Sequence, residues 1–167
     1  MLKVCASLCV SAALILLTVT PVAAQTMTVL QLQIDSPKML VDGAEQQIDE
    51  HGTVPVIIDG RAVVPLRPVI EALGGTVLWD YDLRLLTVRD YIGKNEIILK
   101  INSYDSVVNA KTGPRLDVAP VLVNNVTMVP ILFVSYHLGY EIQWDDYTRT
   151  ITITKDYNQE PLSDQDA

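Results

Sequence analysis

A short helical stripe of apolar residues stands out in the middle of the chain. Four of them follow the spacing i, i+3, i+4 and i+7: Leu66, Val69, Ile70 and Leu73. This spacing is typical of a helix that buries one face. Gly74 follows directly, at the place where glycine commonly ends a helix because it adopts the left-handed conformation without strain. The pattern therefore predicts a short amphipathic helix.

Two stretches of alternating residues come after this helix, as in a β-hairpin. Val77 and Trp79 share one side of the first stretch, and Leu86 and Val88 share one side of the second. Residues 80–82 separate the two stretches and contain two aspartates, which favour turns. The four alternating side chains are expected to face a common core, because a strand points successive side chains to opposite faces.

The helix and hairpin pattern occurs twice. A shift of 65 residues lays residues 55–88 over 120–153 without a gap and with eleven identities, among them Leu73 with Leu138 and Trp79 with Trp144. Such self-similarity indicates an internal repeat. The fold class predicted is α+β, with two tandem repeats, each a small antiparallel β-sheet packed on one short α-helix. The expected boundaries are 25–92 for the first repeat, 93–156 for the second and 157–167 for a flexible acidic tail.

The outward faces of the two hairpins differ. The first carries three leucines, Leu78, Leu83 and Leu85, where the second has polar residues. Exposed apolar groups that lie together usually mark a contact surface. Three interpretations are open: the other repeat packs on these leucines, a separate partner does, or they are scattered exposed residues.

The first 24 residues predict export. Lys3 precedes a nearly unbroken apolar run over 4–19, and small residues lead up to Ala24, as at a signal peptidase cleavage site. Residues 1–24 are therefore expected to be a signal peptide. An uncleaved membrane anchor is the competing interpretation, because the run approaches the length of a membrane span. Cys5 and Cys9 both lie in this segment, so the mature chain has no cysteine and holds together without disulfides.

Charge narrows the classes of partner. The chain of 167 residues has 20 acidic residues against 12 Lys and Arg, a formal net charge of -8. An excess of negative charge repels phosphate backbones. Nucleic acid is therefore excluded as an expected partner, and no membrane contact is expected once the signal segment is removed.

The run from Gly60 to Asp80, followed by Arg84 and Val88, resembles the signature of the copper amine oxidase N-terminal domain, also called the stalk domain. The resemblance implies a small antiparallel sheet curled around one helix. It also implies an extracellular protein at the cell envelope of a Gram-positive-type bacterium, often without any oxidase. The second copy is degenerate, because the family's Gly, two Arg and Glu are replaced by Asn125, Val126, Leu132 and Tyr136.

The family name does not supply an activity. A copper amine oxidase site needs three histidine ligands and a tyrosine that matures to a quinone, whereas this chain has only His51 and His137, in non-equivalent positions. No catalytic residue, cofactor or enzyme activity is predicted. Weak candidates for calcium are the paired carboxylates Asp80, Asp82, Asp145 and Asp146. Their other interpretation is turn formation, since aspartate accepts bonds from nearby backbone N–H groups.

Two further groups complete the candidate residues. Arg67 and Glu71 lie four apart on the predicted helix and are able to pair, with Arg61 expected nearby. They either fix the local turn structurally, or the arginines recognise an anionic group. Trp79, Trp144, Leu73 and Leu138 are assigned to the core, although tryptophan also serves as a platform for sugars.

The function expected is that of a non-catalytic, secreted or envelope-associated stalk-type module acting as a scaffold or interaction domain. Its partner would be an envelope component or another extracellular protein, and it would be able to form homo-oligomers through sheet edges. The alternative is an accessory protein that binds wall polysaccharide or a weak calcium site.

Overall fold

The computed structural model of the chain describes residues 27–158. The expected signal peptide lies outside the described residues, as does the expected tail beyond Asn158. The first half of the described chain forms β1 (Met27–Gln33), β2 (Lys38–Val41), β3 (Ala44–Gln47), β4 (Val56–Ile58), β5 (Arg61–Pro65), α1 (Leu66–Ala72), β6 (Thr76–Asp80) and β7 (Leu85–Arg89). The second half forms β8 (Glu96–Lys100), β9 (Ser106–Val108), β10 (Lys111–Thr112), β11 (Val121–Val123), β12 (Val126–Pro130), α2 (Ile131–Leu138), β13 (Glu141–Asp145) and β14 (Thr150–Asp156).

Both helices form where the apolar stripes predict them. In α1 the stripe is fully buried, and Gly74 follows it with a φ of 78°. In α2 the C-terminal cap is Gly139, also left-handed with a φ of 72°. Each helix begins directly after a proline, Pro65 or Pro130, and proline cannot supply an internal helical hydrogen bond. The predicted α+β class with antiparallel sheets is confirmed.

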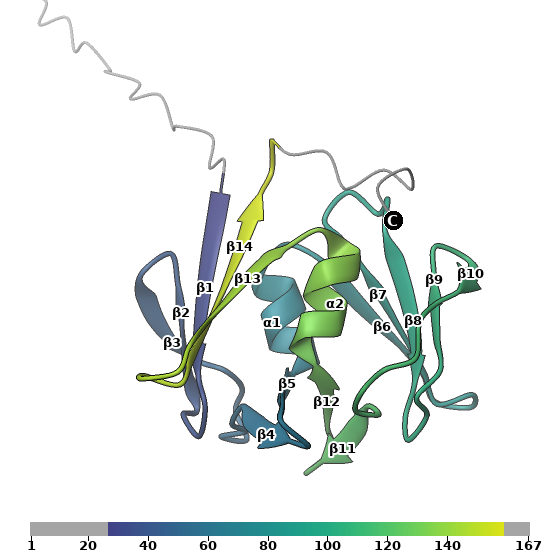
Figure 1. Ribbon diagram of the computed structural model, residues 1–167, viewed down its shortest axis with the longest axis horizontal. Coiled ribbons are helices and arrows are strands. Elements are labelled where there is room, and N and C mark those ends of the chain that lie inside the picture. The colour runs from purple at the N-terminus through teal and green to yellow at the C-terminus, as the bar shows by residue number, and fades with distance from the viewer. Residues whose placement is uncertain (1–26, 159–167) are drawn as a thin grey trace, which may run out of the picture.

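The strands pair across the two halves. The first sheet has the order β13-β14-β1-β2-β3, the second has the order β10-β9-β8-β7-β6, and the third has the order β11-β12-β5-β4. Every one of these sheets combines strands of the first half with strands of the second. Strands β1 to β7 of the first half correspond in order to β8 to β14 of the second. Under this correspondence the first sheet has the same arrangement as the second, and the third sheet is symmetric. Figure 1 shows the consequence: the first two sheets flank the helices on opposite sides, and the third lies across one end.

This pairing differs from the expectation that each repeat has its own sheet. Strand β1 lies along β14, with Leu30 opposite Ile153 and Leu32 opposite Ile151. The two leucines are fully buried, and the isoleucines nearly so. A strand from residues 27–33 thus completes its apolar face with a strand more than a hundred residues later. Periodicity reports which face of a strand is apolar, but it carries no information on the strand's neighbour.

A common core lies between the helices and the two flanking sheets. It contains Leu73 and Leu138, both fully buried, together with residues of α1, α2, β1, β7, β8 and β14. A smaller cluster covers the other face of the third sheet and centres on Val63, Val118 and Met128. The main core is therefore shared by both halves, and neither half encloses it alone.

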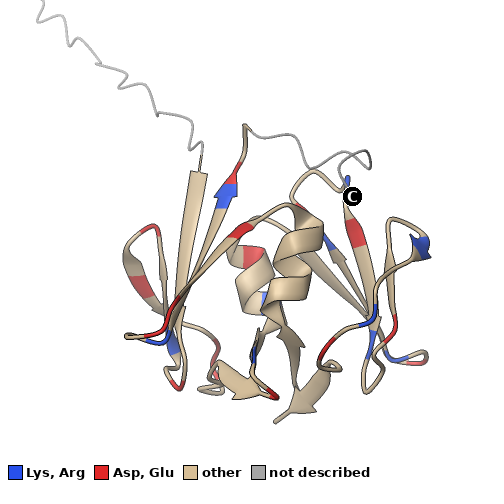
Figure 2. Ribbon diagram, viewed as in Figure 1, with Lys and Arg blue, Asp and Glu red and all other residues tan. Residues whose placement is uncertain are grey.

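Charged side chains lie mainly on loops and outer strands, and α2 carries no Lys, Arg, Asp or Glu (Figure 2). Lys155 of β14 is an exception, being only 1% exposed. Its ammonium lies 5.0 Å from the ring centre of Tyr91 and 5.5 Å from that of Tyr140, distances at which a cation is attracted to an aromatic face. Burial lowers the pKa of Lys155, against the opposing pull of the Asp90 and Asp156 carboxylates.

The start of the predicted tail is packed. Tyr157 meets the ring of Tyr91 edge-on at 4.8 Å, and its carbonyl accepts a hydrogen bond from the Tyr91 hydroxyl at 3.0 Å. This contact ties the end of β14 to the loop that joins the two halves. None of the helices within residues 27–158 has the length and apolar character to span a bilayer.

Candidate binding site

The three hairpin leucines are not covered by the other half of the molecule. Leu78 is 53% exposed and Leu83 is 59% exposed, whereas Leu85 is half-buried. Leu78 lies on β6, the edge strand of the second sheet, on the face opposite the buried Val77. The expectation that the second repeat packs on these leucines is therefore wrong for the described residues. The reason is that the hairpin packs its other face on the core, with β8 extending the sheet alongside β7.

The structure separates Arg61 from the pair formed by Arg67 and Glu71. Arg67 donates to the Glu71 carboxylate at 3.3 Å and to the backbone carbonyl of Val77 at 3.1 Å. It thereby joins α1 to β6, as expected of a structural role. Arg61 instead forms an ion pair of 2.7 Å with Asp117, which precedes β11. These exposed pairs contribute little stability, about 0–1 kcal/mol each. Their main effect is on the polarity of the surface around them.

The candidate carboxylates form turns. One oxygen of Asp80 accepts the backbone N–H groups of residues 82 and 83, and Asp145 accepts those of residues 147 and 148. Bonds from Thr148 and Tyr147 lower the pKa of Asp145. Within residues 27–158, no three His, Cys, Asp or Glu side chains gather in a group that could hold a metal ion. Asp80 and Asp145 thus stabilise the turns of their hairpins.

The two aligned tryptophans differ in environment. Trp79 is partly buried against the main core, and its ring meets Tyr81 edge-on at 5.9 Å. Trp144 is 45% exposed, and its indole N–H donates to Asp146 at 2.5 Å. The assignment of Trp144 to the core is therefore wrong. The strand phase is as predicted, but the surface that Trp144 faces is left open.

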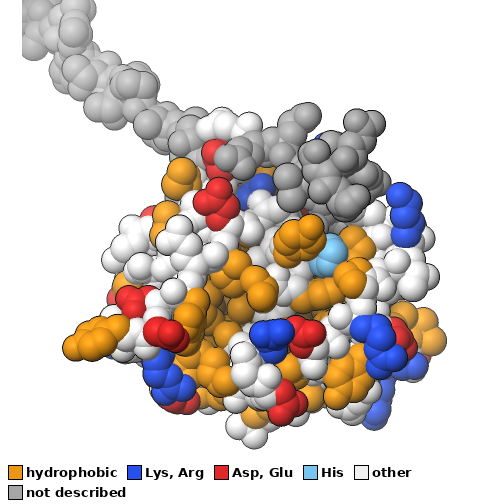
Figure 3. Space-filling model, in the orientation of Figure 1, with side chains coloured by type: hydrophobic (Ala, Val, Ile, Leu, Met, Phe, Trp, Pro, Cys, Tyr) orange, Lys and Arg blue, Asp and Glu red, His pale blue; other side chains and the backbone are white. Residues whose placement is uncertain are grey.

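Trp144 borders a hollow that we call the apolar groove, with a volume of about 750 Å³. Its walls are formed by α2, the β4–β5 hairpin, the β13–β14 hairpin and the loop before β11. Large side chains that line it and remain substantially exposed are Ile57, Leu132, Tyr136 and Trp144. Hydrophobic side chains gather around this hollow on the face that carries α2 (Figure 3). Its size falls in the range of ligand pockets, about 300–1,000 Å³.

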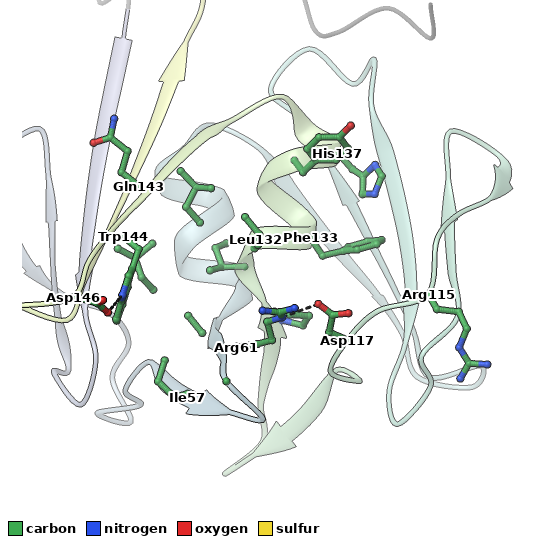
Figure 4. A pocket seen from close by; sticks show the side chains of 17 residues that line it. Ile57, Arg61, Arg115, Asp117, Leu132, Phe133, His137, Gln143, Trp144 and Asp146 are labelled. Atoms are coloured by element: carbon green, nitrogen blue, oxygen red, sulfur yellow. Dashed lines mark hydrogen bonds and ion pairs between the residues drawn. The ribbon is translucent and has the colours of Figure 1, made fainter. Parts of the chain in front are cut away.

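Polar groups also line the apolar groove. In Figure 4 Asp146 lies on one side of the groove, and the Arg61–Asp117 pair lies between the side chains of Ile57 and Phe133. Arg115 also borders this groove, and its guanidinium lies 5.6 Å from the ring centre of Tyr104. Arg61 and Asp146 each have a partner already, so the surface of the groove that remains unpaired is mainly apolar.

His137 contributes an imidazole to the same groove. Its ring lies 4.5 Å from the ring centre of Phe133 and 5.1 Å from that of Tyr136. Burial lowers the pKa of His137, because it disfavours the charged imidazolium. A neutral imidazole among aromatic rings adds to the apolar character of the wall.

A second hollow, which we call the polar groove, is related to the first by exchange of the two halves and has a volume of about 660 Å³. The 65-residue offset relates the residues of the two grooves: Leu66 with Ile131, Arg67 with Leu132, Glu71 with Tyr136, Trp79 with Trp144, and Ile57 with Leu122. The Arg67–Glu71 ion pair thus stands where the apolar groove has Leu132 and Tyr136. The two equivalent grooves therefore differ in character: Leu132 and Tyr136 make one apolar, and the Arg67–Glu71 ion pair makes the other polar.

Asp49 and His51 lie on the loop that borders the polar groove. One Asp49 oxygen accepts the backbone N–H groups of His51 and Thr53. Burial acts to raise the pKa of Asp49, but these hydrogen bonds outweigh it and the net pKa is lowered. Asp49 therefore holds the loop in shape as an ionised carboxylate.

Sequence reasoning missed the apolar groove. Its signal was present, because Leu132 and Tyr136 replace a charged pair at exposed helical positions. Along the sequence, those replacements indicate only a loss of the family's motif. The cross-half placement of the β4–β5 hairpin against α2 and β13 was needed to show that Ile57 and Trp144 join them at one surface.

The fold and these hollows define an α+β module of intertwined antiparallel sheets with open surface grooves. A model of the copper amine oxidase N-terminal domain matches residues 44–153, and the chain belongs to this family. The matched segment is continuous and crosses both halves, from β3 into β14. A search of curated proteins finds no significant match. The family domain is a non-catalytic part of those oxidases.

Proposed function

We propose that this protein is a non-catalytic, secreted or envelope-associated module that acts as a scaffold or interaction domain by holding a partner protein in the apolar groove. The observation that carries the proposal is the cluster of exposed Leu132, Tyr136, Trp144 and Ile57 around one hollow. Export is supported by the signal-peptide pattern of residues 1–24.

The chemistry of the groove favours a protein segment as its occupant. Aliphatic side chains such as Leu132 and Ile57 have no hydrogen-bonding capacity, and their exposure costs free energy that a matching apolar side chain relieves. Tyrosine, tryptophan and arginine are the residues that dominate protein interfaces, and Tyr136, Trp144 and Arg61 all line this groove. An apolar segment flanked by charges fits it best.

The polar side chains around the groove are engaged in structural roles, which favours binding over catalysis. Arg61 pairs with Asp117, and Asp146 accepts from the indole of Trp144. His137 contacts aromatic rings, where a general base would need an acid or nucleophile within hydrogen-bond reach. These contacts fix the positions of the side chains that line the groove, as is expected of a binding surface.

Fluorescence of anilinonaphthalene sulfonate, a dye that brightens in apolar sites, tests the groove. Wild-type protein should enhance the dye's emission in a saturable way. Leu132→Lys should remove most of that enhancement, because it places a charge in the hollow. Leu122→Lys changes the equivalent side of the polar groove, where Leu122 is 47% exposed, and serves as the matched control. Equal dye binding by Leu132→Lys and wild type would refute the role of the groove.

Wall polysaccharide remains the second candidate, at the polar groove. Trp79 and Tyr81 stand beside Arg67, Glu71 and His51, and aromatic faces beside hydrogen-bonding groups suit sugars. Tyr81 is 84% exposed, so Tyr81→Ala should abolish retention on purified wall polysaccharide without loss of stability. Tyr147→Ala, on the other hairpin tip and 97% exposed, is the control. Adding calcium to the same assay tests the calcium alternative, and unchanged retention by Tyr81→Ala would exclude this site.

A further inference from the structure

The molecule exposes an apolar projection as well as an apolar groove. We call the projection the leucine ridge; it consists of Leu78, Leu83 and Leu85 on the β6–β7 hairpin. Leu78 and Leu83 are each more than half exposed. The equivalent positions of the β13–β14 hairpin are Gln143, Thr148 and Thr150. The ridge is therefore confined to the first half of the molecule.

The groove and the ridge lie on different elements. The groove is bordered by α2, the β4–β5 hairpin and the β13–β14 hairpin, whereas the ridge lies on the outer face of the second sheet. One copy therefore cannot cover its own groove with its own ridge while both hairpins stay in their sheets. When the ridge of one copy occupies the groove of a second copy, one groove and one ridge of this pair stay open for further copies.

Charge along the two surfaces is complementary. Across the outer face of the second sheet, Leu85 of β7 lies between Asp80 of β6 and Lys100 of β8. The groove also carries unlike charges at its two ends.

Asp146 and Arg115 stand on opposite sides of the groove, with the Arg61–Asp117 pair between them (Figure 4). Asp117 neutralises part of the charge of Arg61. Docking with the acidic side of the ridge toward Arg115 and the basic side toward Asp146 pairs opposite charges at both margins.

We infer that the partner held in the apolar groove is a second copy of this chain, which inserts its leucine ridge, so that copies assemble head to tail. This inference rests on the proposed function of the groove. It replaces the expected sheet-edge association by a contact between side-chain surfaces. Because the ridge and groove of one copy face different partners, the assembly extends beyond a dimer.

The net charge of -8 sets the conditions for assembly. Copies repel one another at low ionic strength, and salt screens this repulsion over about 8 Å at physiological concentration. Apolar contact is not screened. Assembly is therefore expected to strengthen from low to physiological salt.

Sedimentation velocity of the chain without its predicted signal segment provides the test. Wild type should show sedimentation coefficients that rise with concentration beyond a dimer. Leu83→Lys on the ridge and Leu132→Lys in the groove should each weaken association at least about tenfold, which corresponds to ~1.4 kcal/mol. Leu122→Lys, an exposed leucine outside both surfaces, should associate as wild type does. Circular dichroism establishes that each variant is folded.

Mixing the two monomeric variants is the decisive measurement. Leu132→Lys keeps its ridge and Leu83→Lys keeps its groove, so an equimolar mixture should form a one-to-one dimer that does not extend. A wild type that stays monomeric, or a folded mixture that stays monomeric, overturns the inference. In either case, dye binding that is sensitive to Leu132→Lys would leave the proposed function of the groove standing. Absence of dye binding by wild type at concentrations at which it is monomeric would end the proposed function itself.

Discussion

Separation of the two halves is the strongest test of the intertwined fold. Cutting the chain in the loop between β7 and β8 yields fragments 25–92 and 93–158. In the first fragment β1 loses its partner β14, and the β6–β7 hairpin loses β8. In the second fragment the reciprocal pairs are lost. If strand pairing runs across the halves, neither fragment should fold alone.

The magnitude follows from the buried residues of β1 and its continuation. Leu30 and Leu32 are fully buried and Ile34 is 5% exposed. Burial of such side chains stabilises a protein by roughly 1.5–3 kcal/mol each, so these three account for about 4.5–9 kcal/mol as an upper estimate. Domains have total stabilities of about 5–15 kcal/mol. Loss of the β1–β14 contact alone is therefore comparable to the whole stability.

Circular dichroism and proton NMR of the separate and mixed fragments provide the assay. Each fragment should lack a cooperative thermal transition, and the equimolar mixture should regain one. A mixture in which the second fragment carries Ile151→Asp should stay unfolded, because Ile151 faces Leu32 across the β1–β14 pair. Cooperative unfolding of either fragment by itself would refute the reasoning and would support two independent repeats.

Two further predictions concern single side chains. Trp79→Ala should cost about 3–5 kcal/mol of unfolding free energy, as for a large core residue, whereas Trp144→Ala should cost roughly half as much, because 45% of Trp144 is already exposed. Urea unfolding followed by circular dichroism measures both, and equal costs would contradict the different environments. His137 has a pKa lowered from 6.5 by burial, so the native state favours the neutral ring. The stability it contributes is present above pH 6.5 and is lost as the pH falls through the lowered pKa. As the pH falls below 6.5, the urea midpoint of His137→Gln should therefore decrease less than that of wild type. An equal decrease in both proteins would exclude this contribution.

The sequence by itself determined the local structure. The stripe of α1, the glycine that ends it and the inward phase of Val77, Leu86 and Val88 follow from side-chain spacing, and the structure has them as predicted. The resemblance to the stalk-domain family rests on residues that lie together along the chain, and the family match agrees with it. These features depend on near neighbours, which a linear pattern records.

Only the tertiary structure decided which strands pair and which surfaces stay open. Trp79 and Trp144 have the same place in the same pattern and each borders a groove, yet Trp79 packs against the core whereas Trp144 is 45% exposed. The helical residues in the two grooves also differ, with an Arg67–Glu71 ion pair in one and Leu132 with Tyr136 in the other. Strand partners more than a hundred residues apart are selected by the total burial of the fold, because many pairings satisfy the same alternation.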